Sequence, residues 1–245
     1  MKPEYESMGS AAIHATESLT SAHAHLMPIF ATSTFTFDSA EQGMKRFAGK
    51  EPGFIYSRFG NPTTSAAADA VAALEAFGIT SENGAPLSLK AILTSSGQSA
   101  MAAMFFANLS AGDTVLTHYS VYGGTHEFLF DFLKRFGINA LIDSFNDLNA
   151  VEDILNKDPS VKMIHIETPA NPTMQCIDLA AVCRIAKQYG VKVTVDNTFA
   201  TPYLQQPFKY GVDFVFHSAT KFLNGHGTSI GGVLVGKDVD FMNKP

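Results

Sequence analysis

A chain of 245 residues, 46% hydrophobic and 16% charged, is long enough to bury a large core in one big domain or two smaller ones. Its formal net charge of −6 argues against nucleic acid or an anionic membrane as the main partner. The chain shows no apolar stretch of membrane-spanning length, no signal-peptide pattern and no metal-ligand spacing of its two cysteines, so we expect a cytoplasmic protein without a bound metal.

Helix and strand signals alternate from about Asn61 onward. Residues 1–53 are broken by proline and glycine, so we expect an irregular N-terminal arm followed by one large domain over 54–245. Helices are expected over 62–77, 98–109, 124–136 and 178–189, a loop over 79–89, and strands over 90–94, 114–118, 162–167, 191–197, 214–217 and 232–236. Short apolar strands separated by helices predict an α/β fold with a mostly parallel sheet and helices on both faces.

Residues capable of chemistry follow the expected strands. In such sheets ligands bind at the carboxyl ends of the strands. Each of these residues, taken alone, could also have an ordinary structural role in a turn, a helix cap or side-chain packing. Their expected position at the same edge of the sheet favours one common binding site. The residues are the run Ser95–Ser99, then Tyr119, Tyr122, Glu167, Asn171, Asp196 and Lys221.

The segment Phe214–Gly232, FVFHSATKFLNGHGTSIGG, is the most informative part of the chain. Lys221 comes just after an apolar strand and close to the hydroxyls of Ser218 and Thr220. A lysine amine whose pKa is lowered by burial captures an aldehyde cofactor as a Schiff base, and the hydroxyls donate hydrogen bonds to a phosphate.

The other strand ends supply the remaining parts of a pyridoxal-phosphate site. Asp196 is suited to face the pyridine nitrogen and keep it protonated. Gly97 and Gln98 open a helix whose free backbone amides suit the phosphate. An aromatic residue such as Tyr122 can stack on the ring.

Six motifs together resemble the pyridoxal-phosphate enzymes of the sulfur amino-acid (transsulfuration, Cys/Met metabolism) family. They are YSRFGNPT (56–63), SSGQSAM (95–101), YGGTH (122–126), ETPANPT (167–173), VDNTFATPYLQQP (195–207) and HSATKFLNGHG (217–227). They occur in the order and spacing of that family and cover most of residues 25–236. The resemblance implies an aminotransferase-like fold (fold type I) and a homotetramer built from active-site dimers.

The same resemblance implies residue roles. Lys221 carries the cofactor and moves protons between Cα and Cβ of the substrate, while Asp196 pairs with the pyridine nitrogen. Tyr122 stacks on the ring and acts as an acid or base near the γ-carbon. Asn171 approaches the phenolic oxygen, and the phosphate is held by Gly97, Gln98, Ser218, Thr220 and, from the neighbouring subunit, Tyr56 and Arg58.

The reaction is indicated by smaller details. The segment GHGTSIGG (225–232), Gln98 and the Gly123–Gly124 pair resemble O-acetylhomoserine sulfhydrylases, whereas methionine γ-lyases usually carry a cysteine at the position of Gly124. We therefore expect sulfide to replace the leaving group of O-acetylhomoserine, or of another O-acylhomoserine, in methionine biosynthesis. Other segments look equally like γ-lyases, so methionine γ-lyase and cystathionine γ-synthase or γ-lyase remain alternatives.

Members of this family continue with a smaller C-terminal domain that carries an arginine for the substrate's α-carboxylate, and that domain is missing here. A catalytically incomplete, cofactor-binding fragment is therefore another expectation to keep. A dinucleotide-binding protein would share the parallel sheet, but GxGxxG does not follow the first strand.

Overall fold

The computed structural model describes residues 5–15, 24–81 and 83–242. Its centre is a seven-stranded sheet with the order β1-β7-β6-β5-β4-β2-β3. All neighbouring strands are parallel except at β7, which runs antiparallel to β1 and β6. The strands are β1 (Lys90–Thr94), β2 (Thr114–His118), β3 (Asn139–Asp143), β4 (Val161–Glu167), β5 (Lys192–Asp196), β6 (Phe214–Ser218) and β7 (Gly232–Gly236).

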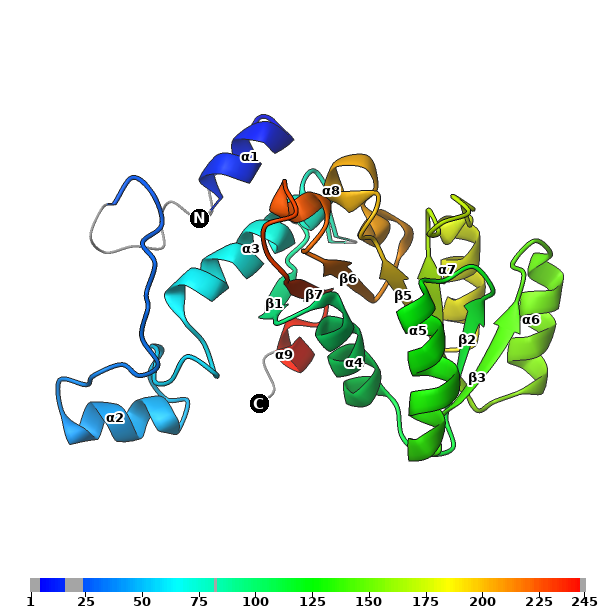
Figure 1. Ribbon diagram of the computed structural model, residues 1–245, viewed down its shortest axis with the longest axis horizontal. Helices are drawn as coiled ribbons and strands as arrows, with labels where there is room; N and C mark the ends of the chain where they lie inside the picture. The colour runs from blue at the N-terminus through cyan, green and yellow to red at the C-terminus, as the bar shows by residue number, and fades with distance from the viewer. Residues whose placement is uncertain (1–4, 16–23, 82, 243–245) are drawn as a thin grey trace.

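Helices cover both faces of this sheet (Figure 1), and a separate apolar core forms on each face. On β6, Phe214 and Phe216 point to one core and Val215 to the other, as the two-residue period of a strand requires. One core contains α3 (Pro62–Ala76), α6 (Leu148–Lys157) and α7 (Leu179–Gln188). The other contains α4 (Gly97–Asn108), α9 (Val239–Met242) and the turns that follow α5 (Gly123–Glu127). The predicted mostly parallel sheet with helices on both faces is therefore confirmed.

Short helical turns complete the domain. The helix expected over 124–136 is α5 followed by a π-helical turn, η2 (Phe128–Phe132), and a 3₁₀ turn, η3 (Leu133–Phe136). Further turns are α8 (Thr201–Leu204), η4 (Pro207–Tyr210) and η5 (Phe222–Asn224). Within the described ranges, no helix is both long and apolar enough to cross a membrane.

The expectation of an irregular arm is wrong, because the arm contains α1 (Met8–His14) and α2 (Ala40–Phe47). Both helices begin with a serine cap: Ser7 Oγ accepts from Ser10 N, and Ser39 Oγ accepts from Gln42 N. Both helices are too short for a repeating apolar pattern to indicate them in the sequence. Their first residues are defined by the serine caps. Residues 1–4 and 16–23 of the expected arm lie outside the described residues.

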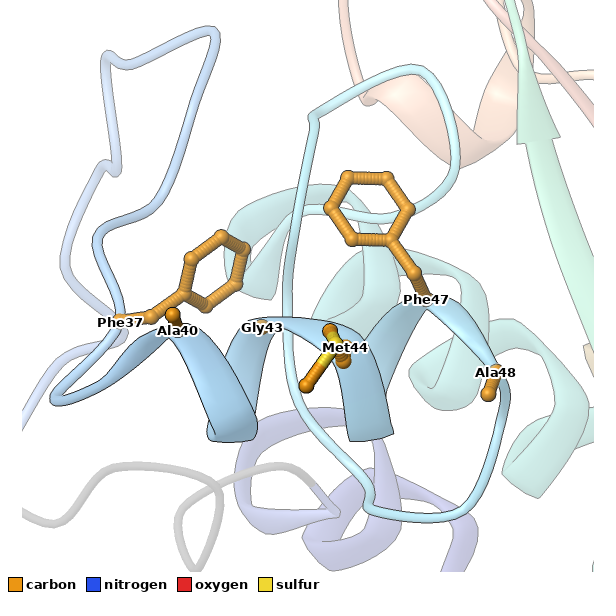
Figure 2. A pocket seen from close by; sticks show the side chains of 6 residues that line it. All are labelled: Phe37, Ala40, Gly43, Met44, Phe47 and Ala48. Atoms are coloured by element: carbon orange, nitrogen blue, oxygen red, sulfur yellow. The ribbon is translucent and has the colours of Figure 1, made fainter.

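The arm extends away from the sheet, and α2 lies far from it (Figure 1). Figure 2 shows an apolar hollow beside this helix, lined by Phe37, Gly43, Met44 and Phe47 among others. Met44 and Phe47 are 67% and 68% exposed. The arm therefore has no buried core of its own around α2.

Candidate active site

The carboxyl ends of β1, β2, β4, β5 and β6 meet at one edge of the sheet because these strands share a direction. A cavity of about 260 Å³ lies there. Among the residues that line it are eight of the ten predicted site residues: Lys221, Tyr122, Asp196, Asn171, Gly97, Gln98, Ser218 and Thr220. The structure thus brings together residues that come from five segments of the chain.

The first wall of the cavity is the N-terminus of α4. Ser96 caps this helix, and its Oγ accepts from Ser99 N at 3.1 Å. The amides of Gly97 and Gln98 have no intrahelical partner, as in the first turn of any α-helix. Gly97 is packed so closely that a Cβ there would lie 2.7 Å from Ser218 Cβ. Backbone amides and a hydroxyl therefore meet at one point, which suits a phosphate.

Asp196 forms the floor at the end of β5. Its Oδ1 accepts hydrogen bonds from both N and Oγ1 of Thr198, and Thr198 Oγ1 accepts from Ser218 N at 2.8 Å. Burial raises the pKa of Asp196, and the two bonds from Thr198 oppose that shift. Oδ2 has no partner among the described residues. A cationic group at Oδ2 would offset the cost of burying the carboxylate.

Glu167 ends β4 beside Asp196 and holds two loops by their backbones. Its Oε2 accepts from Tyr122 N at 2.6 Å, and its Oε1 accepts from Asn171 N at 2.8 Å. Burial, then the charge of Asp196, raises the pKa of Glu167 to about 7. The sequence pattern places Glu167 at this edge of the sheet but assigns it no role. The signal that could have indicated a functional residue is a charged side chain at the end of an apolar strand.

His118, at the end of β2, supports Glu167 from behind. Its Nε2 accepts a hydrogen bond from Glu167 N at 3.0 Å. Burial lowers the pKa of His118 to about 4, so the ring is neutral and its unprotonated nitrogen can accept this bond.

Tyr122 is 50% exposed and stands at the start of α5, where its side chain lines the cavity. Gly124 lies against the ring: a Cβ there would be 2.7 Å from Tyr122 Cε1 and 2.8 Å from Gln98 Nε2. Gly123, by contrast, has nothing within 4 Å of a Cβ position. Tyr119, considered with Tyr122 from the sequence, is 78% exposed and does not line the cavity.

Lys221 lines the cavity from the connection between β6 and β7. The expectation of a buried lysine is wrong, because Lys221 is exposed. It follows the end of β6 by three residues. Its N donates to Ser218 O at 3.1 Å, and Thr220 is bonded through its N and Oγ1 to Gly231. The backbone of the lysine is thereby anchored.

Tyr56 and Arg58 do not line this cavity. The guanidinium carbon of Arg58 lies 5.4 Å from the ring centroid of Tyr56 and 5.2 Å from that of Phe59. Tyr56 also forms a β-bridge with Thr34. The two residues belong to the arm side of α3, so within one chain they stand apart from the other eight.

The chemistry of the cavity fits pyridoxal phosphate. Free helix amides with two hydroxyls suit its phosphate, a half-buried carboxylate suits a protonated ring nitrogen, and a lysine amine suits its aldehyde. Such a set at the carboxyl edge of this sheet defines a pyridoxal-phosphate enzyme of fold type I.

The chain belongs to the Cys/Met metabolism PLP-dependent enzyme family, whose sequence profile matches residues 9–245. It is 43% identical over 237 residues to L-methionine gamma-lyase of Fusobacterium nucleatum subsp. nucleatum, covering 96% of this chain and 56% of that protein. It is 39% identical over 226 residues to O-succinylhomoserine sulfhydrylase of Pseudomonas aeruginosa, covering 92% and 53%. The chain thus spans about half the length of the curated relatives it matches.

Solved structures agree with this membership. A putative O-acetylhomoserine (thiol)-lyase from Campylobacter jejuni superimposes with a TM-score of 0.86 at 31% identity, over 97% of this chain and 56% of that one. That structure contains N'-pyridoxyl-lysine-5'-monophosphate. Cystathionine gamma synthase from Xanthomonas oryzae, in complex with cystathionine, gives 0.83 at 32% identity, over 96% and 56%.

Proposed function

We propose that the protein holds pyridoxal phosphate on Lys221 and replaces the leaving group of an O-acylhomoserine by sulfide to give homocysteine. The observation that carries the choice of reaction is the contact of Gly124 with Tyr122. No Cβ fits at residue 124 with the ring where it is, so an enzyme with cysteine there must place its tyrosine differently. The glycine instead lets the Tyr122 ring and Gln98 lie directly against the main chain, and we propose that this position of the ring suits replacement at the γ-carbon.

When bound, pyridoxal phosphate supplies an electron sink that eases removal of a proton from Cα of an amino acid. The amides of Gly97 and Gln98 and the hydroxyls of Ser218 and Thr220 bind its phosphate. The free Oδ2 of Asp196 holds a proton on the ring nitrogen. Tyr122 would cover one side of the ring and Asn171 would approach the phenolic oxygen, because both residues line the cavity.

Proton movements fall to two side chains. Lys221 Nζ takes the proton from Cα of the substrate and moves a proton at Cβ, since its backbone is anchored and its side chain is free to swing. Tyr122 Oη gives or takes a proton next to Cγ, where the acyl carboxylate departs and sulfide forms the new C–S bond.

The substrate's α-carboxylate needs a cation in addition. Among the described residues that line the cavity, Lys221 is the one Lys or Arg, and in this scheme its amine carries first the cofactor and then the Cα proton. We therefore propose that the partner of the α-carboxylate comes from outside this lining. We also propose that the sites are shared between subunits of a cytoplasmic homotetramer, with Tyr56 and Arg58 completing the neighbour's phosphate site.

Elimination at the γ-carbon of methionine is the second candidate. It is favoured by the L-methionine gamma-lyases of Fusobacterium nucleatum subsp. nucleatum and Treponema denticola, each 43% identical to this chain. Both reactions use the same early proton transfers, so the two candidates differ in what happens at Cγ.

Steady-state kinetics separate the candidates. We expect a larger kcat/KM for homocysteine formation from O-acetylhomoserine and sulfide than for methanethiol release from methionine. O-Succinylhomoserine in place of the acetyl ester tests the leaving group. A clear preference for methionine would move the assignment to a γ-lyase.

A further inference from the structure

Glu75 is a fully buried carboxylate on α3 that takes no part in the proposed chemistry. It is 0% exposed and does not line the cavity. A buried acid is costly unless hydrogen bonds or an opposite charge compensate it, so its partners are informative.

One oxygen of Glu75 joins two strand ends. Oε1 lies 2.7 Å from His217 Nε2 and accepts from Asn197 Nδ2 at 3.0 Å. A carboxylate oxygen accepts, so His217 carries a proton on Nε2 in this arrangement. His217 is adjacent in the chain to Ser218, and Asn197 is adjacent to Asp196. Glu75 therefore contacts, from the layer behind the sheet, the residues next to two proposed cofactor ligands.

The helix end that carries Glu75 is itself pinned. Gln206 Nε2 donates to the carbonyl oxygens of Leu74 and Phe77, each at 2.9 Å. Gln205 Nε2 donates to Asn197 Oδ1 at 3.0 Å and to the carbonyl oxygen of Thr168, just past β4, at 2.8 Å. Through Oε1 the carboxyl group of Glu75 is thus part of a bonded frame, while Oε2 is buried with no hydrogen-bond partner among the described residues.

We propose that Glu75 is a positioning residue that sets the distance between Asp196 on β5 and the Ser218–Lys221 segment after β6. These two places hold opposite ends of the cofactor in the proposed function, on which this inference rests. A hydrogen-bonded crosspiece between the strand ends would hold the residues that bind the ring nitrogen and the phosphate at a set separation, in addition to the link through Thr198.

The test is Glu75→Gln, which keeps the volume of the side chain and removes its charge. Asp69→Asn is the matched control: it makes the same chemical change on the same helix, at a partly exposed residue whose Oδ1 lies 4.0 Å from Lys90 Nζ. For each protein, measure the visible circular dichroism of bound pyridoxal phosphate, its dissociation constant by fluorescence, kcat, KM and Tm.

We expect Glu75→Gln to change the visible dichroism, to weaken cofactor binding roughly tenfold and to lower kcat about 10- to 100-fold with a smaller change in KM. Asp69→Asn should match wild type in all of these. A folded Glu75→Gln protein with a lower Tm but with wild-type dichroism and cofactor affinity would show a purely stabilising role and overturn the proposal.

A second variant covers the case in which Glu75→Gln does not fold. Asn197→Ser removes one donor to Glu75 together with the side-chain bonds between Asn197 and Gln205, and leaves the bond from His217 to Glu75. We expect the same changes at smaller size, and unchanged dichroism and affinity would again overturn the proposal. Failure of the wild-type protein to give a pyridoxyl label on Lys221 after borohydride reduction would instead overturn the proposed function, and this inference with it.

Discussion

The backbone amide of Tyr122 donates to Oε2 of Glu167 at 2.6 Å, across 45 residues of sequence. The side chain that lines the cavity is therefore held through its own main chain by a carboxylate at the end of β4. Because the same carboxylate also accepts from Asn171 N, Glu167 fixes the backbone positions of two cavity loops, the one at Tyr122 and the one at Asn171.

The protonation of Glu167 predicts how stability varies with pH. Its pKa is raised from the ordinary 4.5 to about 7, so the folded state holds this proton more tightly than the unfolded chain. The stabilising contribution is complete below pH 4.5 and is lost as pH rises to about 7. At about 1.4 kcal/mol per pKa unit, the change in the free energy of unfolding is at most about 3.5 kcal/mol.

Glu167→Gln removes that titration. We expect the difference in free energy of unfolding, wild type minus variant, to fall between pH 4.5 and 7, measured by urea unfolding at half-unit steps. Exposed Glu127→Gln serves as the control for loss of a carboxylate. A difference that is flat across this range would show that Glu167 is not the titrating group.

Borohydride reduction tests the covalent attachment. With pyridoxal phosphate present, we expect reduction and peptide mapping to place the pyridoxyl group on Lys221, because it is the lysine that lines the cavity. Lys221→Arg keeps the charge but cannot form the bond, and should give no labelled peptide. A label on another lysine of the wild-type protein would refute the assignment.

Asp196→Asn should leave the fold intact and lower kcat/KM strongly. The amide cannot hold a proton on the ring nitrogen, and the loss of one oriented charge costs about 2–4 kcal/mol of barrier, or roughly 30- to 1,000-fold in rate. Thr198 can still donate to the amide oxygen, which preserves the local turn. Turnover close to that of wild type would remove Asp196 from the mechanism.

Adjacent glycines give a matched pair of substitutions at Tyr122. Gly124→Ala places a Cβ 2.7 Å from Tyr122 Cε1 and must displace the ring or Gln98. Gly123→Ala meets nothing within 4 Å. We expect kcat/KM with O-acetylhomoserine and sulfide to fall about tenfold or more for Gly124→Ala and to stay near wild type for Gly123→Ala. Equal effects of the two would argue against the contact.

Subunit complementation tests whether Arg58 completes the site of a neighbouring subunit. Arg58→Ala and Lys221→Ala chains should each be inactive alone, and mixing them should restore part of the activity. In a mixed dimer, one site receives an intact Lys221 from one chain and an intact Arg58 from the other. Mixed dimers demonstrated by mass that show no recovery would count against a shared site.

The sequence predicted the strands well where consecutive residues of a strand are buried on both faces of the sheet. The runs at β4 and β5 are apolar because both faces of these strands are covered, and their limits agree with the structure within one residue. The strand β3 lacks such a run: it lies at the sheet edge, and Leu141 and Ile142 are 39% and 43% exposed. Helix α2 is defined by its serine cap more than by burial.

The site was predictable where residues directly follow strands, because parallel strands bring their carboxyl ends together. Glu75 had no such marker. It lies in the Ala-rich run of α3, and its partner His217 is 142 residues away in the chain. A contact of that kind follows from the packing of α3 on the sheet, which no local pattern specifies.

The reversed strand β7 has one more consequence. Since β6 and β7 are antiparallel neighbours, Lys221 sits on a hairpin whose base is closed by the bonds between Thr220 and Gly231. Residues 222–230 therefore form the loop of this hairpin, beyond the bonds between Thr220 and Gly231. Ile230, in this loop, lines the cavity. A change in the sequence of residues 222–230 would therefore alter one wall of the cavity while the bonds between Thr220 and Gly231 hold the backbone next to Lys221 in place.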